Sequence, residues 1–263
     1  MSFAQPNPAP IAALAHDRAA VMAELRRLIP RMGEQRKPLP FGLAAIDSHL
    51  PDGGLACGAL HEVVPAAEGC VAAAFGFIAA VLARLAYPLL FVTPAYGLRP
   101  YCRHGRLHGH GLNALGLDPA RLILVEAAHR KETLWAMEEA VRSAVPAAVV
   151  GLIDTLDLKT SQRLHLAATE AGLPVFLLRP APTLESSAAA TRWRIGTAKA
   201  ARDRFGLVTQ PRWHLQLERC RNGRPGQWVV EYDHVAHRFS LAAALADFSR
   251  VRGAGEKSIK QAS

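Results

Sequence analysis

Cysteines are few in this sequence, and none of them forms a C-x-x-C pair. The four cysteines are therefore not spaced as in a zinc ribbon or a disulfide framework, and a reducing compartment fits them best. The apolar run of residues 71–86 contains Arg84 and is too short to span a bilayer. The N-terminal segment MSFAQPNPAP lacks the basic and apolar regions of a signal peptide. We therefore expect a cytoplasmic protein without membrane contact.

Acidic residues are fewer than basic ones. The sequence has 22 Asp and Glu residues against 31 Lys and Arg residues, which gives a formal net charge of +9. A basic protein of this kind often binds a polyanion, usually nucleic acid, and the alternative is a basic surface without such a partner. Half of the 263 residues are hydrophobic, which supplies a core for one large α/β domain, with or without appendages.

Continuous apolar segments alternate with helix-like segments in the middle of the chain. The predicted strands are residues 59–64, 89–93, 121–127, 147–153 and 174–179. The predicted helices between them are residues 71–86, 132–144 and 158–172, the last of which is closed by Gly172. Strands that are apolar throughout are typical of a parallel sheet covered by helices on both faces. The sequence therefore predicts an α/β fold with a mostly parallel sheet flanked by helices.

The N-terminal part of the chain differs from this core. Residues 17–29 predict a helical arm that Pro30 ends, and residues 1–37 as a whole are expected to be a flexible N-terminus with this arm and a linker. The arm could dock on a partner or pack on the chain's own core, and the pattern leaves both open. Its apolar face consists of Val21, Leu25, Leu28 and Ile29.

The segment after the last predicted parallel strand changes character again. Strands are predicted at residues 192–197, 211–220 and 226–233, and the turn RNGRPG joins the last two as a hairpin. We expect these strands to add an antiparallel, basic edge to the sheet. The core domain is predicted to span residues 38–252, and residues 253–263 are predicted to be a disordered tail.

Basic residues are concentrated in this predicted edge. Residues 192–224 contain nine basic and two acidic residues. Arg and Trp alternate in RWR and PRW, so a strand places them on opposite faces, with Trp193 and Trp213 in the core. The arginines then bind DNA or an acidic partner, or they form a solvated face without a partner. The candidate contact residues are Arg192, Arg194, Arg212, Arg219, Arg221 and Arg224.

The segment between the first predicted strand and the first predicted helix lies where a phosphate-binding loop would be. Such a loop reads G-x-x-x-x-G-K-[ST], whereas residues 64–71 read VPAAEGCV. Gly69 is retained, but Val64, Cys70 and Val71 replace the first Gly, the Lys and the Ser or Thr. Cysteine and valine supply neither the charge that neutralises phosphates nor the hydroxyl that holds Mg²⁺. The sequence therefore predicts a degenerate loop without a bound cofactor.

The segment YCRHGRLHGHG contains the ligand types of a metal site. Cys102, His104, His108 and His110 are all residues that bind zinc in proteins. The alternative is a Gly- and Arg-rich surface loop, whose positive charge opposes metal binding. Since no second cluster completes a site in the sequence, we favour the loop and predict no metal site.

Several segments of the chain resemble known families. GLAAIDSHLPDGGLACGALHEVV is similar to the strand and turn that lead into the phosphate loop of RecA-type recombinases. RLHGHGLNALGLDPARLILVEA, ETLWAMEEAVRSA, AAATRWRI and PRWHLQLERCRNGRPG are similar to the ImuA family of SOS mutagenesis proteins, which also resembles the cell-division inhibitor SulA. The order and spacing of these segments, which cover most of residues 38–233, carry the resemblance.

This resemblance implies a RecA-like fold and an accessory role in error-prone translesion DNA synthesis. It implies an ImuB-like polymerase-related protein and an error-prone DNA polymerase as partners. RecA recombinase, DNA and further copies of the chain are additional candidate partners.

The resemblance also shows where the other parts of a RecA-type ATPase would be. The Glu that activates water would fall at Ala95, and the Mg²⁺-linked Asp at Gly151 or Asp154. Because the Lys, the hydroxyl and the base are missing together, we expect a scaffold protein that is not an enzyme. The alternatives are a nucleotide-dependent DNA-binding ATPase and a SulA-like inhibitor of cell division.

Overall fold

The computed structural model describes residues 37–86, 88–95, 107–179, 186–200, 202 and 204–242. The predicted arm with Val21, Leu25, Leu28 and Ile29 lies outside the described residues, and so does the predicted C-terminal tail. The domain boundaries predicted at both ends therefore stay predictions.

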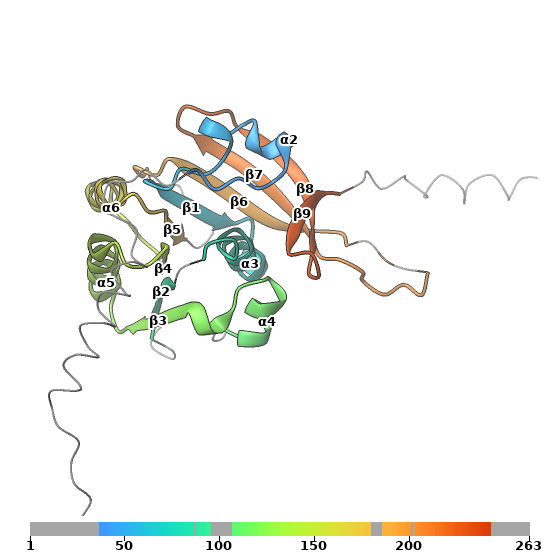
Figure 1. Cartoon of the computed structure of the whole chain (residues 1–263), viewed down its shortest axis with the longest axis horizontal. Coiled ribbons are helices and arrows are strands. Elements are labelled where there is room, and N and C mark those ends of the chain that lie inside the picture. Colours follow the sequence, from blue (N-terminus) through green and yellow to red (C-terminus); the bar gives the residue numbers. More distant parts are fainter. Residues whose placement is uncertain are drawn as a thin grey trace, which may run out of the picture.

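In the described part of the chain, nine strands form one sheet in the order β3-β2-β4-β5-β1-β6-β7-β8-β9 (Figure 1). The strands are β1 Leu60–Pro65, β2 Leu89–Pro94, β3 Leu122–Ala127, β4 Ala148–Leu152, β5 Val175–Leu178, β6 Thr191–Ala198, β7 Arg212–Cys220, β8 Gly226–Asp233 and β9 Arg238–Leu241. From β3 to β6 all neighbours are parallel, and from β6 to β9 all neighbours are antiparallel. The predicted mostly parallel sheet with an antiparallel C-terminal edge is thus confirmed.

Two features of this edge were not predicted. The strand β6 pairs with β1 in parallel, so the change of direction falls between β6 and β7. The strand β9 pairs with β8 and adds one more antiparallel strand beyond the predicted hairpin. Its short sequence RFSL carries too little pattern to indicate a strand by itself.

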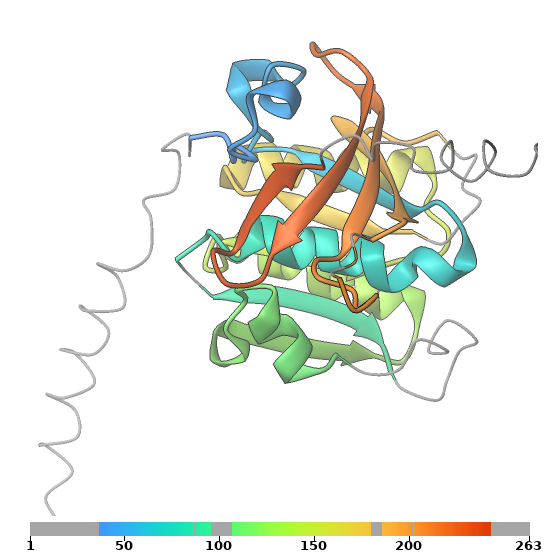
Figure 2. The ribbon, with the colours of Figure 1, turned by 90° about the vertical axis from the view of Figure 1, so that its right-hand side faces the viewer.

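Helices cover both faces of the sheet (Figure 2). The helices α5 and α6 pack on one face, and α3 packs on the other with the short helix α4 beside it. The helices are α2 Ala44–Asp47, α3 Val71–Leu82, α4 Gly109–Ala114, α5 Arg130–Ser143 and α6 Leu158–Ala171, and the 3₁₀ helices are η1 Pro51–Gly53, η2 Glu68–Cys70 and η4 Pro119–Arg121. Among the described residues, no helix is long and apolar enough to cross a membrane.

Local capping chemistry sets the bounds of α6. The Asp157 carboxylate accepts the N–H of Thr160 at 2.8 Å and so caps the first turn. Gly172 ends the helix with a φ of +64°, in the left-handed region that glycine adopts at little cost. Because both signals are local in sequence, the helix was predicted with nearly correct bounds.

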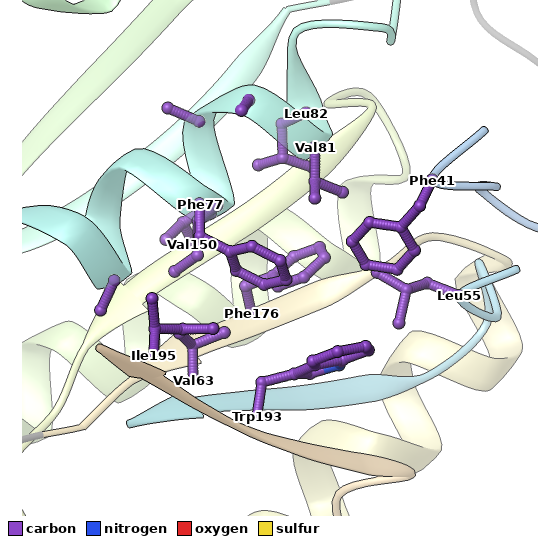
Figure 3. Packing of buried hydrophobic residues seen from close by; sticks show 14 of the residues in the cluster. Phe41, Leu55, Val63, Phe77, Val81, Leu82, Val150, Phe176, Trp193 and Ile195 are labelled. Atoms are coloured by element: carbon purple, nitrogen blue, oxygen red, sulfur yellow. The ribbon is translucent and has the colours of Figure 1, made fainter. Parts of the chain in front are cut away.

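The sheet separates two apolar clusters. On the α3 side, Trp193 of β6 packs against Phe77 of α3 and Phe41, with ring centroids 5.5 and 5.2 Å away (Figure 3). Trp193 is fully buried and Trp213 is 7% exposed, which confirms the prediction that both are core residues. Truncating such a side chain to alanine costs about 3–5 kcal/mol of folding free energy. The other cluster lies between the sheet and the helices α5 and α6.

Candidate functional site

The loop between β1 and α3 satisfies part of its own backbone. The N–H of Cys70 donates to the carbonyl of Ala67 at 2.9 Å, and the N–H of Val71 donates to the carbonyl of Glu68. These bonds form the 3₁₀ turn η2, which leads directly into α3. A phosphate loop instead directs successive N–H groups at its ligand. At these two positions the donors are therefore used by the loop itself.

The side chains of the loop also differ from those of a phosphate loop. Val64 is fully buried in β1, and the sulfur of Cys70 lies 4.0 Å from the hydroxyl oxygen of Thr197 on β6. Glu68 and Gly69 are exposed. A carboxylate at the start of α3 suits the helix dipole, but it opposes the approach of a phosphate. The loop thus carries the Glu68 carboxylate two residues before Cys70, which lies at the position of the lysine in a phosphate loop.

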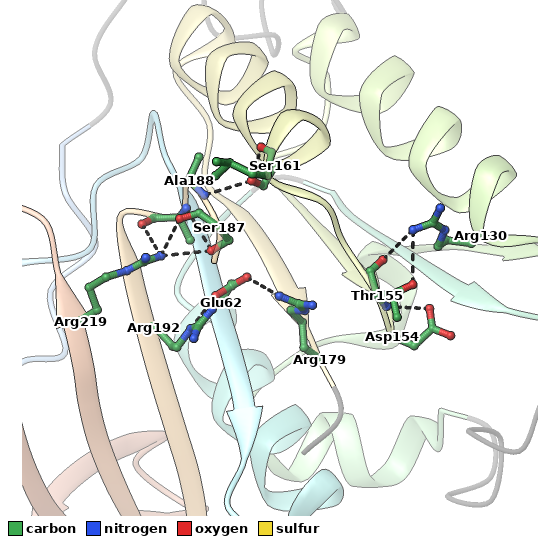
Figure 4. A network of polar contacts seen from close by, with 12 residues as sticks. Glu62, Arg130, Asp154, Thr155, Ser161, Arg179, Ser187, Ala188, Arg192 and Arg219 are labelled. Carbon is green, nitrogen blue, oxygen red and sulfur yellow. Dashed lines mark hydrogen bonds and ion pairs between the residues drawn. The ribbon is translucent and has the colours of Figure 1, made fainter. Parts of the chain in front are cut away.

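The two positions where a metal-linked carboxylate could lie have different surroundings. A Cβ atom at Gly151 would come within 2.1 Å of the sulfur of Met137, so α5 packs where a side chain on β4 would project. Asp154 lies just beyond β4, and its carboxylate accepts the N–H of Thr155 at 2.9 Å (Figure 4). Arg130 binds the carbonyl of Thr155 at 3.1 Å. At Ala95, the position of the water-activating Glu, the backbone N–H donates to the carbonyl of Ala127.

The histidine-rich segment is described only from residue 107 onward. Cys102 and His104 lie outside the described residues. The ring of His108 accepts the N–H of Gly111 and caps α4, while the His110 ring lies 5.5 Å from it. Among the described residues, no group of three or more His, Cys, Asp or Glu side chains could hold a metal ion.

Three of the six candidate arginines are engaged in ion pairs within the sheet. Arg192 binds Glu62 at 2.8 Å, with 14% of its side chain exposed. Arg212 binds Glu231 at 2.6 Å and is buried. Arg194 binds Glu218, and both side chains are about one quarter exposed, at 28% and 23%. These contacts link neighbouring strands on the face opposite Trp193.

The other three arginines contact backbone carbonyls. Arg219 Nη2 donates to the carbonyls of Ser187 and Ala189 at 3.0 and 3.1 Å (Figure 4). Burial and the nearby Arg192 lower the pKa of Arg219 below its usual value. Two of the set are exposed: Arg221, which binds the carbonyl of Ala188, and Arg224, which binds that of Ser48. The six arginines therefore differ in accessibility and do not form one uniform face.

A buried ion cluster lies under this surface. Glu62 of β1 is fully buried and lies between Arg179, 3.1 Å away, and Arg192 (Figure 4). The side chain of Arg179 is also fully buried. Sequence reasoning missed both residues, although the signal was present: a single acid in the apolar strand LHEVV needs a buried cation as its partner.

A second buried polar group precedes Glu62 on β1. Nε2 of His61 lies 2.9 Å from the carbonyl of Ala56, and Nδ1 lies 2.8 Å from the hydroxyl of Thr191. Because a carbonyl only accepts, Nε2 carries the proton and Nδ1 accepts from the hydroxyl. Complete burial lowers the pKa of His61 to about 4, so the ring is neutral at pH 7.

Together, the strand order, the parallel strands β3 to β6 and the strand–loop–helix unit of β1 and α3 define a RecA-like α/β protein. Its loop lacks the Lys and the Ser or Thr of a phosphate-binding loop. The chain matches no family model. It is similar, however, to two relatives named Protein ImuA, from Caulobacter vibrioides strains NA1000/CB15N and CB 15.

Each of these relatives is 35% identical to the chain over 236 residues, which cover 81% of this chain and 93% of the relative. The chain therefore belongs to the ImuA family. Family membership supports a role in the ImuA/ImuB mutagenesis system.

Proposed function

We propose that the chain is a non-catalytic scaffold protein of an SOS-induced complex for error-prone translesion DNA synthesis. The observation that carries this proposal is the chemistry of the loop between β1 and α3. Cys70 and Val71 replace the two residues that neutralise phosphate and hold Mg²⁺, and their N–H groups bond within the loop. Family membership supplies the biological setting.

Packing at Gly151, one of the two candidate metal-linked positions, supports the same proposal. Gly151 lies in β4, where α5 brings Met137 against the strand and leaves no room for a carboxylate. Ala95 offers no base. Losing a group that stabilises charge in the transition state typically costs about 10²–10³-fold in rate, so several such losses together leave little catalysis.

The partners of this scaffold are part of the proposal. The scaffold would bind an ImuB-like polymerase-related protein and an error-prone DNA polymerase. RecA recombinase, DNA and a second copy of the chain are further candidate partners. The contact residues are the exposed arginines Arg221 and Arg224, whose charge is accessible to an acidic protein or a DNA backbone, whereas the charge of the partly exposed Arg194 is offset by Glu218.

Calorimetry with MgATP tests the non-catalytic role. The full-length protein is titrated with and without single-stranded DNA, and we expect no saturable heat at millimolar nucleotide. Saturable binding, or ATP turnover stimulated by the DNA, would make the chain a nucleotide-dependent ATPase instead.

A genetic experiment tests the biological setting. Deleting the gene should lower damage-induced mutagenesis, and overproducing the protein should leave cell division unchanged. A division block on overproduction together with normal mutagenesis would point to a SulA-like inhibitor.

A further inference from the structure

A shallow groove of about 630 Å³ runs along one side of α6. One wall consists of side chains of α6, and the other of the segment that precedes β6 and the residue that follows β7. The lining residues are Leu158, Gln162, His165, Leu166, Thr169, Ser187, Ala188 and Arg221. None of these was assigned to the phosphate loop, so the groove is a separate feature of the fold.

His165, one of the lining residues, has a hydrogen-bond donor next to each of its ring nitrogens. The N–H of Leu60 donates to Nδ1 at 3.3 Å, and Nη1 of Arg221 lies 3.0 Å from Nε2. Leu60 is fully buried, and a buried N–H without an acceptor is costly. Nδ1 must therefore be the accepting nitrogen, so the neutral ring carries its proton on Nε2. Burial and the charge of Arg221 lower the pKa of His165, which keeps the ring neutral.

With this tautomer, Nε2 of His165 and the guanidinium of Arg221 cannot form a hydrogen bond with each other. Nε2–H of His165 and the guanidinium of Arg221 are both donors, yet they face each other at 3.0 Å. An arginine has no acceptor, and the imidazole has only the one lone pair that Leu60 uses. A carboxylate that lies alongside the two nitrogens, with one oxygen on each, would accept from both in the charge-assisted geometry that arginine favours.

The walls of the groove indicate what carries that oxyanion. Leu158 is 47% exposed and Leu166 is 59% exposed, eight residues apart on the same side of α6. Apolar side chains next to the anion would cover these leucines, whereas a nucleic-acid backbone would leave them in water. An amphipathic peptide with a carboxylate combines both features.

We propose that this groove binds an acidic segment of a partner protein. A carboxylate of the segment bridges Nε2 of His165 and the guanidinium of Arg221 from one side, and the neighbouring apolar side chains of the segment pack on Leu158 and Leu166. The inference rests on the proposed function in one respect, because it treats the chain as a scaffold that binds proteins.

Random peptides displayed on phage, selected on the full-length protein, test the chemistry of this ligand. We expect enrichment of peptides in which Asp or Glu is next to Leu, Ile or Phe. A synthetic peptide of the enriched sequence should bind at least tenfold more weakly to Arg221→Glu and to Leu166→Glu. Both substituted side chains are exposed, so the variants should fold, and circular dichroism checks this.

Matched controls are available in the connections from β6 to β7 and from β8 to β9, whose residues do not line the groove. Arg204→Glu and Val235→Glu also add negative charge at exposed positions, and we expect them to bind the peptide like the unchanged protein. Equal binding to all four variants, or no enrichment of acidic peptides, would overturn the proposal. The proposal would also be overturned if the protein bound single-stranded DNA but no peptide, and if Arg221→Glu abolished the DNA binding.

The tautomer of His165 provides an independent readout. In ¹⁵N-labelled protein, the ring should carry its proton on Nε2, and the acidic peptide should shift the Nε2 resonance. A proton on Nδ1 would contradict the donor–donor arrangement. Failure of these experiments would leave the calorimetric and mutagenesis results of the proposed function unchanged, so the two hypotheses are tested separately.

Discussion

Replacing Glu62 with glutamine would leave a cluster of buried cations without its anion. Glu62 is fully buried, the Arg179 side chain is fully buried, and Arg192 is 14% exposed. Glutamine preserves the shape and can still accept one hydrogen bond, so the change removes charge rather than volume. Breaking a buried ion pair by removing one partner typically costs about 3–5 kcal/mol. We therefore expect Glu62→Gln to lower the free energy of unfolding by about 3 kcal/mol or more.

Urea denaturation followed by circular dichroism measures this loss as a lower midpoint at an unchanged slope. The matched control is Glu218→Gln, which breaks the pair with Arg194 on the same face. Both side chains of that pair are about one quarter exposed, and such pairs contribute about 1 kcal/mol or less. If the two variants lost the same stability, the attraction around Glu62 would be fully offset by desolvation, and the reasoning would be refuted.

Three further predictions concern other parts of the chain. The pKa of His61 is lowered to about 4 in the folded state, so the contribution of the neutral ring to stability is complete above pH 6.5 and is lost as the pH falls toward 4. The variant His61→Asn should remove up to about 3 kcal/mol of this pH dependence, measured by urea denaturation at several pH values. Gly151→Ala forces a Cβ against Met137 and should cost about 1–3 kcal/mol, with less loss when Met137→Val is added, as measured by thermal unfolding. Deleting residues 1–36 should leave the fold intact but abolish co-purification with the ImuB-like partner if the arm docks there, whereas loss of folding would mean that it packs on the core.

The sequence predicted most elements of the core because their signals are local. The strands β1 to β5 are mostly apolar, and Asp157 and Gly172 mark the bounds of α6. The parallel pairing of β6 with β1 could not be predicted, since an apolar pattern reports burial and not the neighbouring strand. The alternation in RWR did predict correctly that Trp193 is buried.

The candidate site was harder to predict than the core. A run of arginines has the same charge whether its members face solvent or cross-strand acids, and the pairing of Arg192 with Glu62 joins residues 130 positions apart. The donor–donor contact of His165 and Arg221 likewise joins positions 56 apart. Such contacts depend on strand order and on the path of connecting segments, which composition and periodicity do not specify.

Two places where a RecA-type ATPase would have catalytic groups, the loop and Gly151, are occupied by internal contacts in this protein. At the loop, the N–H groups of Cys70 and Val71 complete a 3₁₀ turn. At β4, Gly151 admits the side chain of Met137 from α5. Restoring a lysine at the loop alone would therefore supply charge without freeing the backbone donors or making room for a metal-linked carboxylate. These contacts favour our proposal of a non-catalytic scaffold, in which the accessible arginines and the groove along α6 are the proposed contact surfaces.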